Sequence, residues 1–221
     1  LDMVGMVGYQ IQISTFHSFG LNILKKHYDK LGYDKNFTIL DSDDSSTVVK
    51  KILKDMDKDP KKYSYKAIRN KISSAKNELM EPEDLAKFST NDMDDLVVDV
   101  YKKYKEKLRT NNSVDFDDLL MLPITLFRKY PEVLKFYQDR FKYILIDEYQ
   151  DTNEAQYLLT KMISAKYKNI CVVGDNDQSI YSFRGSNYKN ILNFEKDYNN
   201  AKVIMLERNY RSTKQILDVA N

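Results

Sequence analysis

The chain has 221 residues, of which 42% are hydrophobic and 31% are charged, and its formal net charge at pH 7 is +2. This composition fits one or two folded domains with a sizeable apolar core and excludes a disordered or fibrous chain. Because the charge is nearly neutral, any binding of nucleic acid must depend on local motifs. The single cysteine, Cys171, excludes a disulfide framework or a cysteine zinc site, and its apolar neighbours predict a role in core packing.

The sequence contains no membrane-spanning or secretory pattern. No run approaches about eighteen apolar residues, and the first thirty residues lack the basic start, apolar middle and cleavage pattern of a signal peptide. We therefore predict a cytoplasmic protein without a membrane partner.

The first predicted elements are a strand over Gln10–Thr15 and a helix over Phe16–Lys30. The strand consists of alternating polar and apolar residues, and the helix has apolar residues at a spacing of three to four. A strand that leads directly into a helix predicts an α/β unit. His27 lies on this helix without a neighbouring pattern, and we expect it at the surface.

From residue 42 to about residue 111 the pattern is only helical. The predicted helices are Ser45–Met56, Tyr65–Leu79, Pro82–Phe88 and Asp92–Arg109. Capping residues precede them, namely Asp41 or Ser42, Ser64 and Asn91. The lysines of the last helix alternate with acids, which favours a solvated helix face over a phosphate-binding patch; they are Lys102, Lys103, Lys105 and Lys107.

Strands and helices alternate in the remaining sequence. Helices are predicted over Asp115–Tyr130, Pro131–Phe141, Asn153–Ala165 and Asn187–Tyr198. Buried strands are predicted over Tyr143–Ile146 and Asn169–Val173, with a third strand over Lys202–Leu206. Short apolar strands between helices indicate a parallel sheet covered on both faces. We therefore expect an α/β domain, formed by 1–21 and 113–221, that is interrupted by an all-helical insertion at 22–112.

The first chemical motif is Tyr143-Ile-Leu-Ile-Asp-Glu-Tyr-Gln-Asp151, an apolar strand followed by adjacent carboxylates. Ligands bind at the carboxyl ends of parallel strands. A carboxylate at this position can hold Mg²⁺ while its neighbour activates a water molecule for attack on a phosphate. An acidic pair alone is equally typical of an ordinary turn, so this motif needs support from others.

The second motif, Val172 to Gly185, follows the next predicted strand. The amide of Gln178 could sense a terminal phosphate. The later side chains offer flat and cationic surfaces for stacking on bases, and they are Tyr181, Phe183 and Arg184. Taken singly, each aromatic residue is better explained by packing in the core.

The third motif, Leu206-Glu-Arg-Asn-Tyr-Arg-Ser212, places two arginines around a tyrosine at the end of a predicted strand. Arginine offers paired donors to phosphate oxygens, and a tyrosine ring can stack on a purine. A surface ion-pair cluster is the alternative for this motif alone.

In this order the three motifs resemble motifs II, III and IV of the UvrD/PcrA/Rep branch of superfamily 1 helicases, and most closely the PcrA type. The segments Thr15-Phe-His-Ser-Phe19 and Val114-Asp-Phe-Asp-Asp-Leu119 also resemble that family, and Ile72–Leu79 resembles its helical subdomain 1B. The resemblance extends over the chain from about Ile11 onward. It implies a partial RecA-like domain of an ATP-dependent helicase that translocates on single-stranded DNA, with a 3′ to 5′ direction, and acts at duplex junctions.

The resemblance also implies roles for individual residues. Asp147 would coordinate Mg²⁺, and Glu148 would be the general base. Gln178 and Arg211 would contact the γ-phosphate of ATP, and Tyr210 would stack on adenine.

The residues implied on the DNA path are Thr15, Phe16, His17, Tyr181, Phe183 and Arg184. Two positions depart from the family pattern. Phe183 stands where PcrA-type proteins usually have tryptophan, which keeps an aromatic face with a smaller area. The acidic motif reads DEYQD where other relatives have DEFQD, and the catalytic pair is unchanged.

The sequence lacks a phosphate-binding loop of the G-x-x-x-x-G-K-[ST] kind, because none of its six glycines is followed by lysine. We therefore expect a fragment of a helicase that is inactive by itself. Two alternatives remain open: a non-catalytic module that binds single-stranded DNA, and a piece of a helicase-nuclease subunit of the AddA type.

Overall fold

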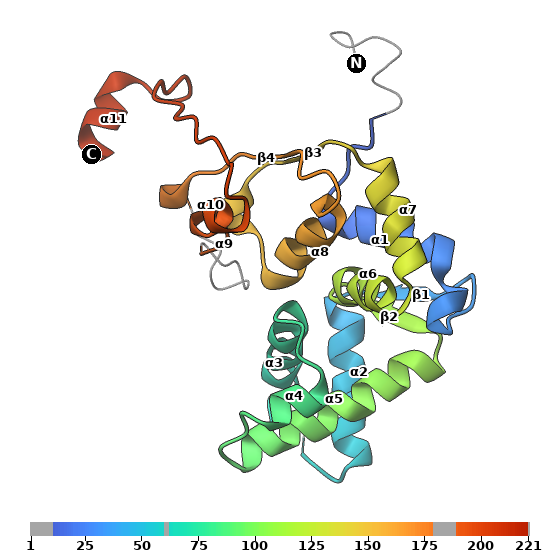
Figure 1. Cartoon of the computed structure of the whole chain (residues 1–221). Helices are drawn as coiled ribbons and strands as arrows, with labels where there is room; N and C mark the ends of the chain where they lie inside the picture. Colours follow the sequence, from blue (N-terminus) through green and yellow to red (C-terminus); the bar gives the residue numbers. More distant parts are fainter. Residues whose placement is uncertain (1–10, 60–61, 179–188, 221) are drawn as a thin grey trace. The chain divides into compact units, whose positions relative to one another are not determined.

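The computed structural model describes residues 11–59, 62–178 and 189–220 (Figure 1). By its internal contacts the chain divides into two units, 1–191 and 192–221, and each is described by itself. The helices are α1 (Phe16–His27), α2 (Ser42–Asp55), α3 (Tyr65–Asn77), α4 (Pro82–Ala86), α5 (Asp92–Thr110), α6 (Asp118–Lys129), α7 (Pro131–Arg140), α8 (Glu154–Ser164), α9 (Lys189–Leu192), α10 (Phe194–Asp197) and α11 (Lys214–Ala220). The strands and short 3-10 turns are β1 (Thr38–Leu40), β2 (Ser113–Asp115), β3 (Ile144–Ile146), β4 (Ile170–Val172), η2 (Asp29–Leu31), η3 (Tyr149–Asp151) and η4 (Asn176–Gln178). In this described part of the chain, no helix combines the length and apolar character that crossing a membrane requires.

The segment from 45 to 110 is helical and contains no strand wherever the structure describes it, as the sequence predicts. Helices α2, α3 and α5 begin at predicted caps. Oδ1 of Asp41 accepts two hydrogen bonds of 2.8 Å from backbone N–H groups in the first turn of α2. Ser64 and Asn91 cap α3 and α5 in the same way. Each such cap satisfies backbone donors that a helix start leaves unpaired and contributes about 1 kcal/mol.

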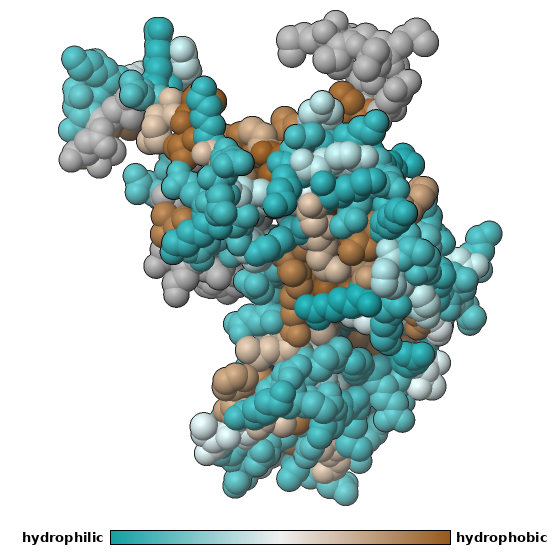
Figure 2. Space-filling view, viewed as in Figure 1, coloured by the Kyte–Doolittle hydropathy of each residue, from teal (hydrophilic) through white to brown (hydrophobic). Residues whose placement is uncertain are grey.

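Helices α2, α3 and α5 share a hydrophobic core of their own, in which Val49, Ile68 and Val100 are fully buried. The outer surface of this helical segment is mostly hydrophilic on the face that Figure 2 shows. Lys102 and Lys103 of α5 are exposed, which agrees with a solvated helix face.

The strands β1 and β2 form a small parallel sheet that the sequence pattern does not predict. Thr38 pairs with Ser113 and Leu40 pairs with Asp115. Since β1 precedes α2 and β2 follows α5, the pair joins the two ends of the helical segment. Because β2 occupies residues up to Asp115, α6 begins at Asp118 and not at the predicted residue 115.

A second core lies among α1, α6, α7 and α8. Ile23, Leu126 and Phe127 are almost completely buried in it. Helices α1 and α6 approach closely at Gly20, where an added Cβ would lie 1.8 Å from the carbonyl oxygen of Leu119. Glycine is therefore the residue that permits this helix packing.

The strands β3 and β4 form the parallel pair that the sequence predicts, in the register Ile144↔Ile170 and Ile146↔Val172. The prediction that these strands are buried on both faces is wrong. Leu145 is 80% exposed, and its partner in the register, Cys171, is also exposed. Side chains alternate between the two faces of a strand, and only the face that carries Ile144 packs on the core. Cys171 is therefore not a core residue.

Two further strand predictions are wrong for the residues that the structure describes. Residues 11–15 and 202–206 have no strand structure, and Ile13 and Leu206 are 88% and 82% exposed. A strand needs hydrogen-bonding partners, and neither segment is paired in a sheet among the described residues. The predicted helix Asn187–Tyr198 is described only from residue 189, and there it is two short helices, α9 and α10, separated at Asn193.

His27 was expected at the surface, and the structure corrects this. The imidazole is half-buried, and its centroid lies 6.0 Å from that of the Tyr137 ring. Burial lowers the pKa of His27, and its Nε2 is buried without a hydrogen-bond partner among the described residues.

The predicted division of the chain into 1–21, 22–112 and 113–221 stays a prediction. The boundary at residue 22 falls inside α1, whose Ile23 and Leu24 belong to the same core as α6. The α/β character of the chain, with small parallel sheets among helices, agrees with the predicted fold class.

Candidate functional site

The strand β3 leads directly to Asp147 and Glu148 at its carboxyl end. Both side chains are exposed, in contrast to the buried Ile146 that precedes them. The backbone N–H of Val173 donates to the carbonyl of Ile146 at 2.8 Å, so the chain after β4 remains hydrogen-bonded to β3 up to its last residue. The adjacent carboxylates therefore lie where two parallel strands end, which is the edge of a parallel sheet at which ligands bind.

The backbone at Glu148 has the left-handed conformation, with φ 51° and ψ 43°. This region is uncommon for a residue with a side chain and costs about 1 kcal/mol or more. The conformation turns the chain sharply into η3, where Tyr149 is 1% exposed and donates its backbone N–H to Val173 at 2.9 Å. Oδ1 of Asp147 accepts a 3.0 Å hydrogen bond from the backbone N–H of Glu148. Hydrogen bonds at Asp147 and at Tyr149 thus hold the turn on both sides of Glu148.

Gln150, in the middle of η3, is 1% exposed and connects the two strand ends. Its Nε2 donates to Oε2 of Glu148 at 2.7 Å, and its Oε1 accepts from the backbone N–H of Asp175 at 3.0 Å. Gly174 makes this approach possible, because a Cβ there would lie 2.6 Å from Oε1 of Gln150. The acidic turn after β3 and the polar loop after β4 therefore share one buried amide.

The loop after β4 carries Gln178 in η4. Nε2 of Gln178 donates to Oδ2 of Asp175 at 2.7 Å, and Oδ1 of Asp175 accepts from the backbone N–H of Asp177 at 3.0 Å. The side chain of Gln178 is exposed. The structure therefore brings Gln178 to the same edge of the sheet as Glu148, whereas the other residues predicted in this motif lie outside the described residues: Tyr181, Phe183 and Arg184.

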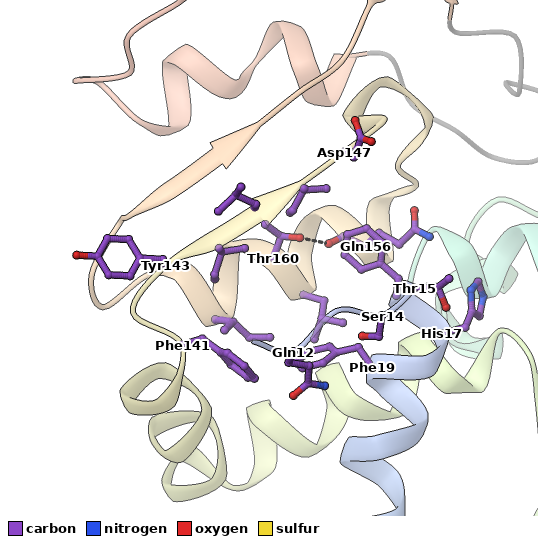
Figure 3. Close-up of a pocket in the computed structure, with 16 residues that line it drawn as sticks. Gln12, Ser14, Thr15, His17, Phe19, Phe141, Tyr143, Asp147, Gln156 and Thr160 are labelled. Carbon is purple, nitrogen blue, oxygen red and sulfur yellow. Dashed lines mark hydrogen bonds between the residues drawn. The ribbon is translucent and has the colours of Figure 1, made fainter. Parts of the chain in front are cut away.

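A cavity of about 460 Å³ lies between the segment that precedes α1, strand β3 and helix α8. Its lining includes Thr15, Phe16, His17 and Asp147. Figure 3 shows Asp147 at the end of β3 and Thr15 and His17 on the other side of this cavity. Three of the residues predicted on a DNA path, Thr15, Phe16 and His17, thus line one cavity with the residue predicted to hold Mg²⁺.

Each of these three residues of the α1 segment also has a structural role. Oγ1 of Thr15 accepts a 3.2 Å hydrogen bond from the backbone N–H of Ser18 and caps α1. Phe16 packs against the core. The ring of His17 lies 5.6 Å from that of Phe116, and burial lowers the pKa of His17, so the neutral imidazole is favoured.

Tyr210 and Arg211 belong to the unit 192–221 and are described within it. The Tyr210 ring is 82% exposed, and the guanidinium carbon of Arg208 lies 4.9 Å from its centroid. Oδ1 of Asn209 accepts hydrogen bonds of 2.9 Å from the backbone N–H groups of Arg211 and Ser212. The turn therefore presents both predicted nucleotide-binding side chains to solvent.

The oxygen atoms at the end of β3 fit a magnesium ion. Mg²⁺ is typically held by one or two carboxylates together with water and phosphate oxygens. Asp147 and Glu148 provide exposed carboxylates, and Oδ1 of Asp151 is buried without a hydrogen-bond partner among the described residues. Burial and then the charge of Glu148 raise the pKa of Asp151. In the described part of the chain, no group of three or more His, Cys, Asp or Glu residues forms a metal site by itself.

Gln150 and Asp175 lie inside the motifs, but no role is predicted for either of them from the sequence. The available signal is the amide of Gln150, two residues after the second carboxylate of the motif that follows β3. Its significance depends on the end of β4, which is 25 residues away from Gln150 in the chain.

Comparison with known proteins identifies the following similarities. The model of the UvrD/REP helicase N-terminal domain matches residues 5–199. The ATP-dependent DNA helicase PcrA of Bacillus subtilis (strain 168) is 56% identical over 220 residues, which are 100% of this chain and 30% of that protein. The ATP-dependent DNA helicase PcrA of Staphylococcus aureus (strain Mu50) is 49% identical over 219 residues, which are 99% of this chain and 30% of that protein. The chain thus spans 30% of the length of these relatives.

Proposed function

This chain belongs to the UvrD/REP helicase family, and from that premise we propose that it is part of an ATP-dependent DNA helicase motor. The observation that carries the proposal is the edge where β3 and β4 end, at which Asp147, Glu148 and Gln178 come together. Similarity to proteins named ATP-dependent DNA helicase PcrA supports the assignment. We further propose that β3 and β4 belong to a RecA-like sheet and that 22–112 is the inserted subdomain.

In this proposal, the exposed carboxylates divide the chemistry of ATP hydrolysis between them. Asp147 would hold Mg²⁺, and Glu148 would accept a proton from the attacking water. Magnesium, when bound, neutralises the charge that develops on the phosphate oxygens. Glu148 can act as a base because its carboxylate is exposed, and its hydrogen bond from Gln150 orients it without occupying both oxygens.

The remaining residues of the proposed ATP site are amide, guanidinium and aromatic groups. Gln178 and Arg211 would contact the γ-phosphate, since both side chains donate hydrogen bonds. Tyr210 would stack on adenine, and its 82% exposure is consistent with a free ring face.

We propose that single-stranded DNA contacts the start of α1, with Thr15 before it, and the residues that follow β4 in the sequence. Thr15, Phe16 and His17 line the cavity beside β3, and Tyr181, Phe183 and Arg184 would add stacking and cationic groups. A 3′ to 5′ direction, action at duplex junctions and a cytoplasmic location complete the proposal.

The test uses the complete gene product that contains this chain, with substitutions at the two carboxylates. Glu148→Gln keeps size and hydrogen bonding but removes the base, so hydrolysis should fall by about 10²–10⁴-fold while binding of MgATP and DNA stays near normal. Asp147→Ala should also weaken magnesium-dependent nucleotide binding, and added Mg²⁺ should restore part of it.

Nucleotide affinity and single-turnover hydrolysis are measured for both variants. The proposal is wrong if Glu148→Gln hydrolyses ATP at nearly the parent rate. Glu154→Gln, on the first turn of α8, is the matched control for loss of a carboxylate and should leave hydrolysis unchanged.

A further inference from the structure

A continuous hydrogen-bonded path joins Gln178 to Glu148 through a single buried side chain. Gln178 Nε2 donates to Asp175 Oδ2 at 2.7 Å. The backbone N–H of Asp175 donates to Gln150 Oε1 at 3.0 Å, and Gln150 Nε2 donates to Glu148 Oε2 at 2.7 Å. The path therefore connects the loop after β4 with the carboxylate after β3.

The orientation of the Gln150 amide is determined by its two partners. A carboxylate can only accept a hydrogen bond, and a backbone N–H can only donate one. Nε2 must therefore face Glu148, and Oε1 must face Asp175. The reversed amide would lose both hydrogen bonds. Since Gln150 is only 1% exposed, its amide atoms would then be buried without partners, and this is energetically costly.

The surroundings leave the Gln150 side chain little freedom to move. A Cβ on Gly174 would lie 2.6 Å from Oε1 and 3.2 Å from the backbone nitrogen of Gln150, so these groups are already in close contact. The neighbouring Tyr149 is held by its backbone bond to Val173. If the backbone of Asp175 moves, the Gln150 amide must therefore move with it, because no free volume separates the two segments at Gly174.

We propose that Gln150 is a positioning residue that links the Glu148 carboxylate to the Asp175–Gln178 loop, so that a rearrangement of the loop changes the orientation of Glu148. The inference rests on the proposed function, in which Glu148 is the base and Gln178 contacts the γ-phosphate. When the Gln178 amide turns to a phosphate oxygen, it gives up its bond to Asp175, and the loop can shift. Gln150 carries that shift to Glu148.

The first experiment compares Gln150→Met and Gln150→Glu with the parent in the complete gene product. Methionine keeps the volume but removes both hydrogen bonds. A catalytic group displaced by about 1 Å costs about 10²-fold in rate, so kcat for DNA-stimulated ATP hydrolysis should fall by about 10- to 100-fold. The KM for ATP should change by less than about threefold, because Gln150 is not proposed to contact the nucleotide.

The matched controls are Gln138→Met and Gln138→Glu. Gln138 of α7 is a half-buried amide whose Nε2 donates to the carbonyl of Met162 at 2.8 Å, so it makes one structural bond elsewhere in the fold. Both controls should keep kcat within about twofold of the parent, since they do not touch the reacting groups. An equal loss in the Gln138 variants would show a general effect of losing a buried amide and would overturn the inference.

The division of the loss between kcat and KM separates positioning from a merely structural role. A displaced Glu148 lowers kcat at a nearly unchanged KM for ATP, whereas a general loosening of the site changes KM as well. Gln150→Glu keeps an acceptor for the backbone N–H of Asp175 but loses the donor to Glu148, so it gives the same test if Gln150→Met fails to fold. A loss that falls on KM alone would overturn the inference.

A double-mutant cycle tests the link to the loop. If Gln150 transmits the state of Gln178, stimulation of hydrolysis by single-stranded DNA should be lost in Gln150→Met and in Gln178→Ala, and the double variant should lose no more than either one. Multiplicative losses would overturn the link. Glu148→Gln is the reference variant. If it hydrolyses ATP normally, the proposed function is wrong. If it is inactive but the Gln150 variants hydrolyse ATP like the parent, only the present inference is wrong.

Discussion

Nζ of Lys76 lies 2.8 Å from Oδ2 of Asp115, and both side chains are almost completely buried. The same ammonium lies 2.7 Å from Oδ1 of Asp118. Lys76 lies in the last turn of α3, whereas Asp115 lies in β2 and Asp118 at the start of α6. One buried cation therefore ties the core of α2, α3 and α5 to the core that surrounds the candidate site.

We expect Lys76→Met to destabilise the chain strongly, because it leaves two buried carboxylates without their cation. Breaking a buried ion pair in this way costs about 3–5 kcal/mol. Lys71→Met on the same helix is the matched control, since Lys71 pairs with Asp94 at the surface and such pairs contribute about 1 kcal/mol or less. Urea unfolding of both variants measures the two costs, and similar values would show that the buried cation has no special role.

The buried cluster should also make stability depend on pH. Burial and then the charge of Asp115 raise the pKa of Asp118 to about 7. Its pKa in the unfolded chain is about 4, so the folded state binds more protons between these values. The contribution of Asp118 to stability is therefore present at low pH and is lost as pH rises from about 4 through about 7.

Asp118→Asn removes this titration and provides the comparison. Because burial raises the pKa of Asp118 in the folded parent to about 7, the parent loses this contribution between pH 5 and pH 8. Its unfolding free energy should therefore fall over this range relative to that of Asp118→Asn. Denaturant unfolding at several pH values measures both. Parallel pH curves for parent and variant would contradict the assignment.

Gly20→Ala should destabilise the packing of α1 on α6. Although alanine favours helix formation by about 1 kcal/mol over glycine, its Cβ would lie 1.8 Å from the carbonyl oxygen of Leu119. The helices would have to separate, and overpacking of this kind costs about 1–3 kcal/mol or more. Asn22→Ala, at an exposed position of the same helix, should change stability little in the same thermal unfolding experiment.

Tyr181 and Phe183, which follow β4 in the sequence, should contribute to binding of single-stranded DNA. Each base–aromatic stack is worth roughly 1–3 kcal/mol, so Tyr181→Ala and Phe183→Ala should each weaken binding by about 5- to 150-fold. Fluorescence anisotropy with an oligonucleotide at low salt measures the affinity. Phe88→Ala removes an aromatic side chain that is 66% exposed on the helical segment and is the control; unchanged affinity in the Tyr181 and Phe183 variants would contradict the stacking role.

The chain by itself should not hydrolyse ATP, with or without DNA. It contains no G-x-x-x-x-G-K-[ST] loop, and backbone N–H groups and a lysine of that kind are needed to hold the phosphates. Steady-state phosphate release by the purified chain measures this. Hydrolysis that DNA stimulates and that Glu148→Gln abolishes would show the prediction to be wrong.

The sequence predicts those features that depend on neighbouring residues. Asp41, Ser64 and Asn91 cap their helices as expected, because a cap bonds to backbone groups two or three residues away. The parallel strands β3 and β4 are found close to their predicted bounds, since short apolar runs between helices are typical of such strands.

Burial and distant pairing are decided only by the tertiary structure. Leu145 and Cys171 belong to apolar runs, yet both are exposed because packing covers the other face of the strand pair. Residues 11–15 alternate as a strand does, yet a strand requires a partner for its hydrogen bonds.

The candidate site also combines local features, which the sequence predicts, with distant contacts, which only the fold determines. The sequence by itself determined that Asp147 and Glu148 follow a strand and that Gln178 follows another, because those relations are local. Only the fold decided that Gln150 reaches Asp175, which is 25 residues away, and that Lys76 reaches Asp115, which is 39 residues away. A single sequence carries no periodic signal for a hydrogen bond between distant residues, since such a bond depends on how whole elements pack against one another.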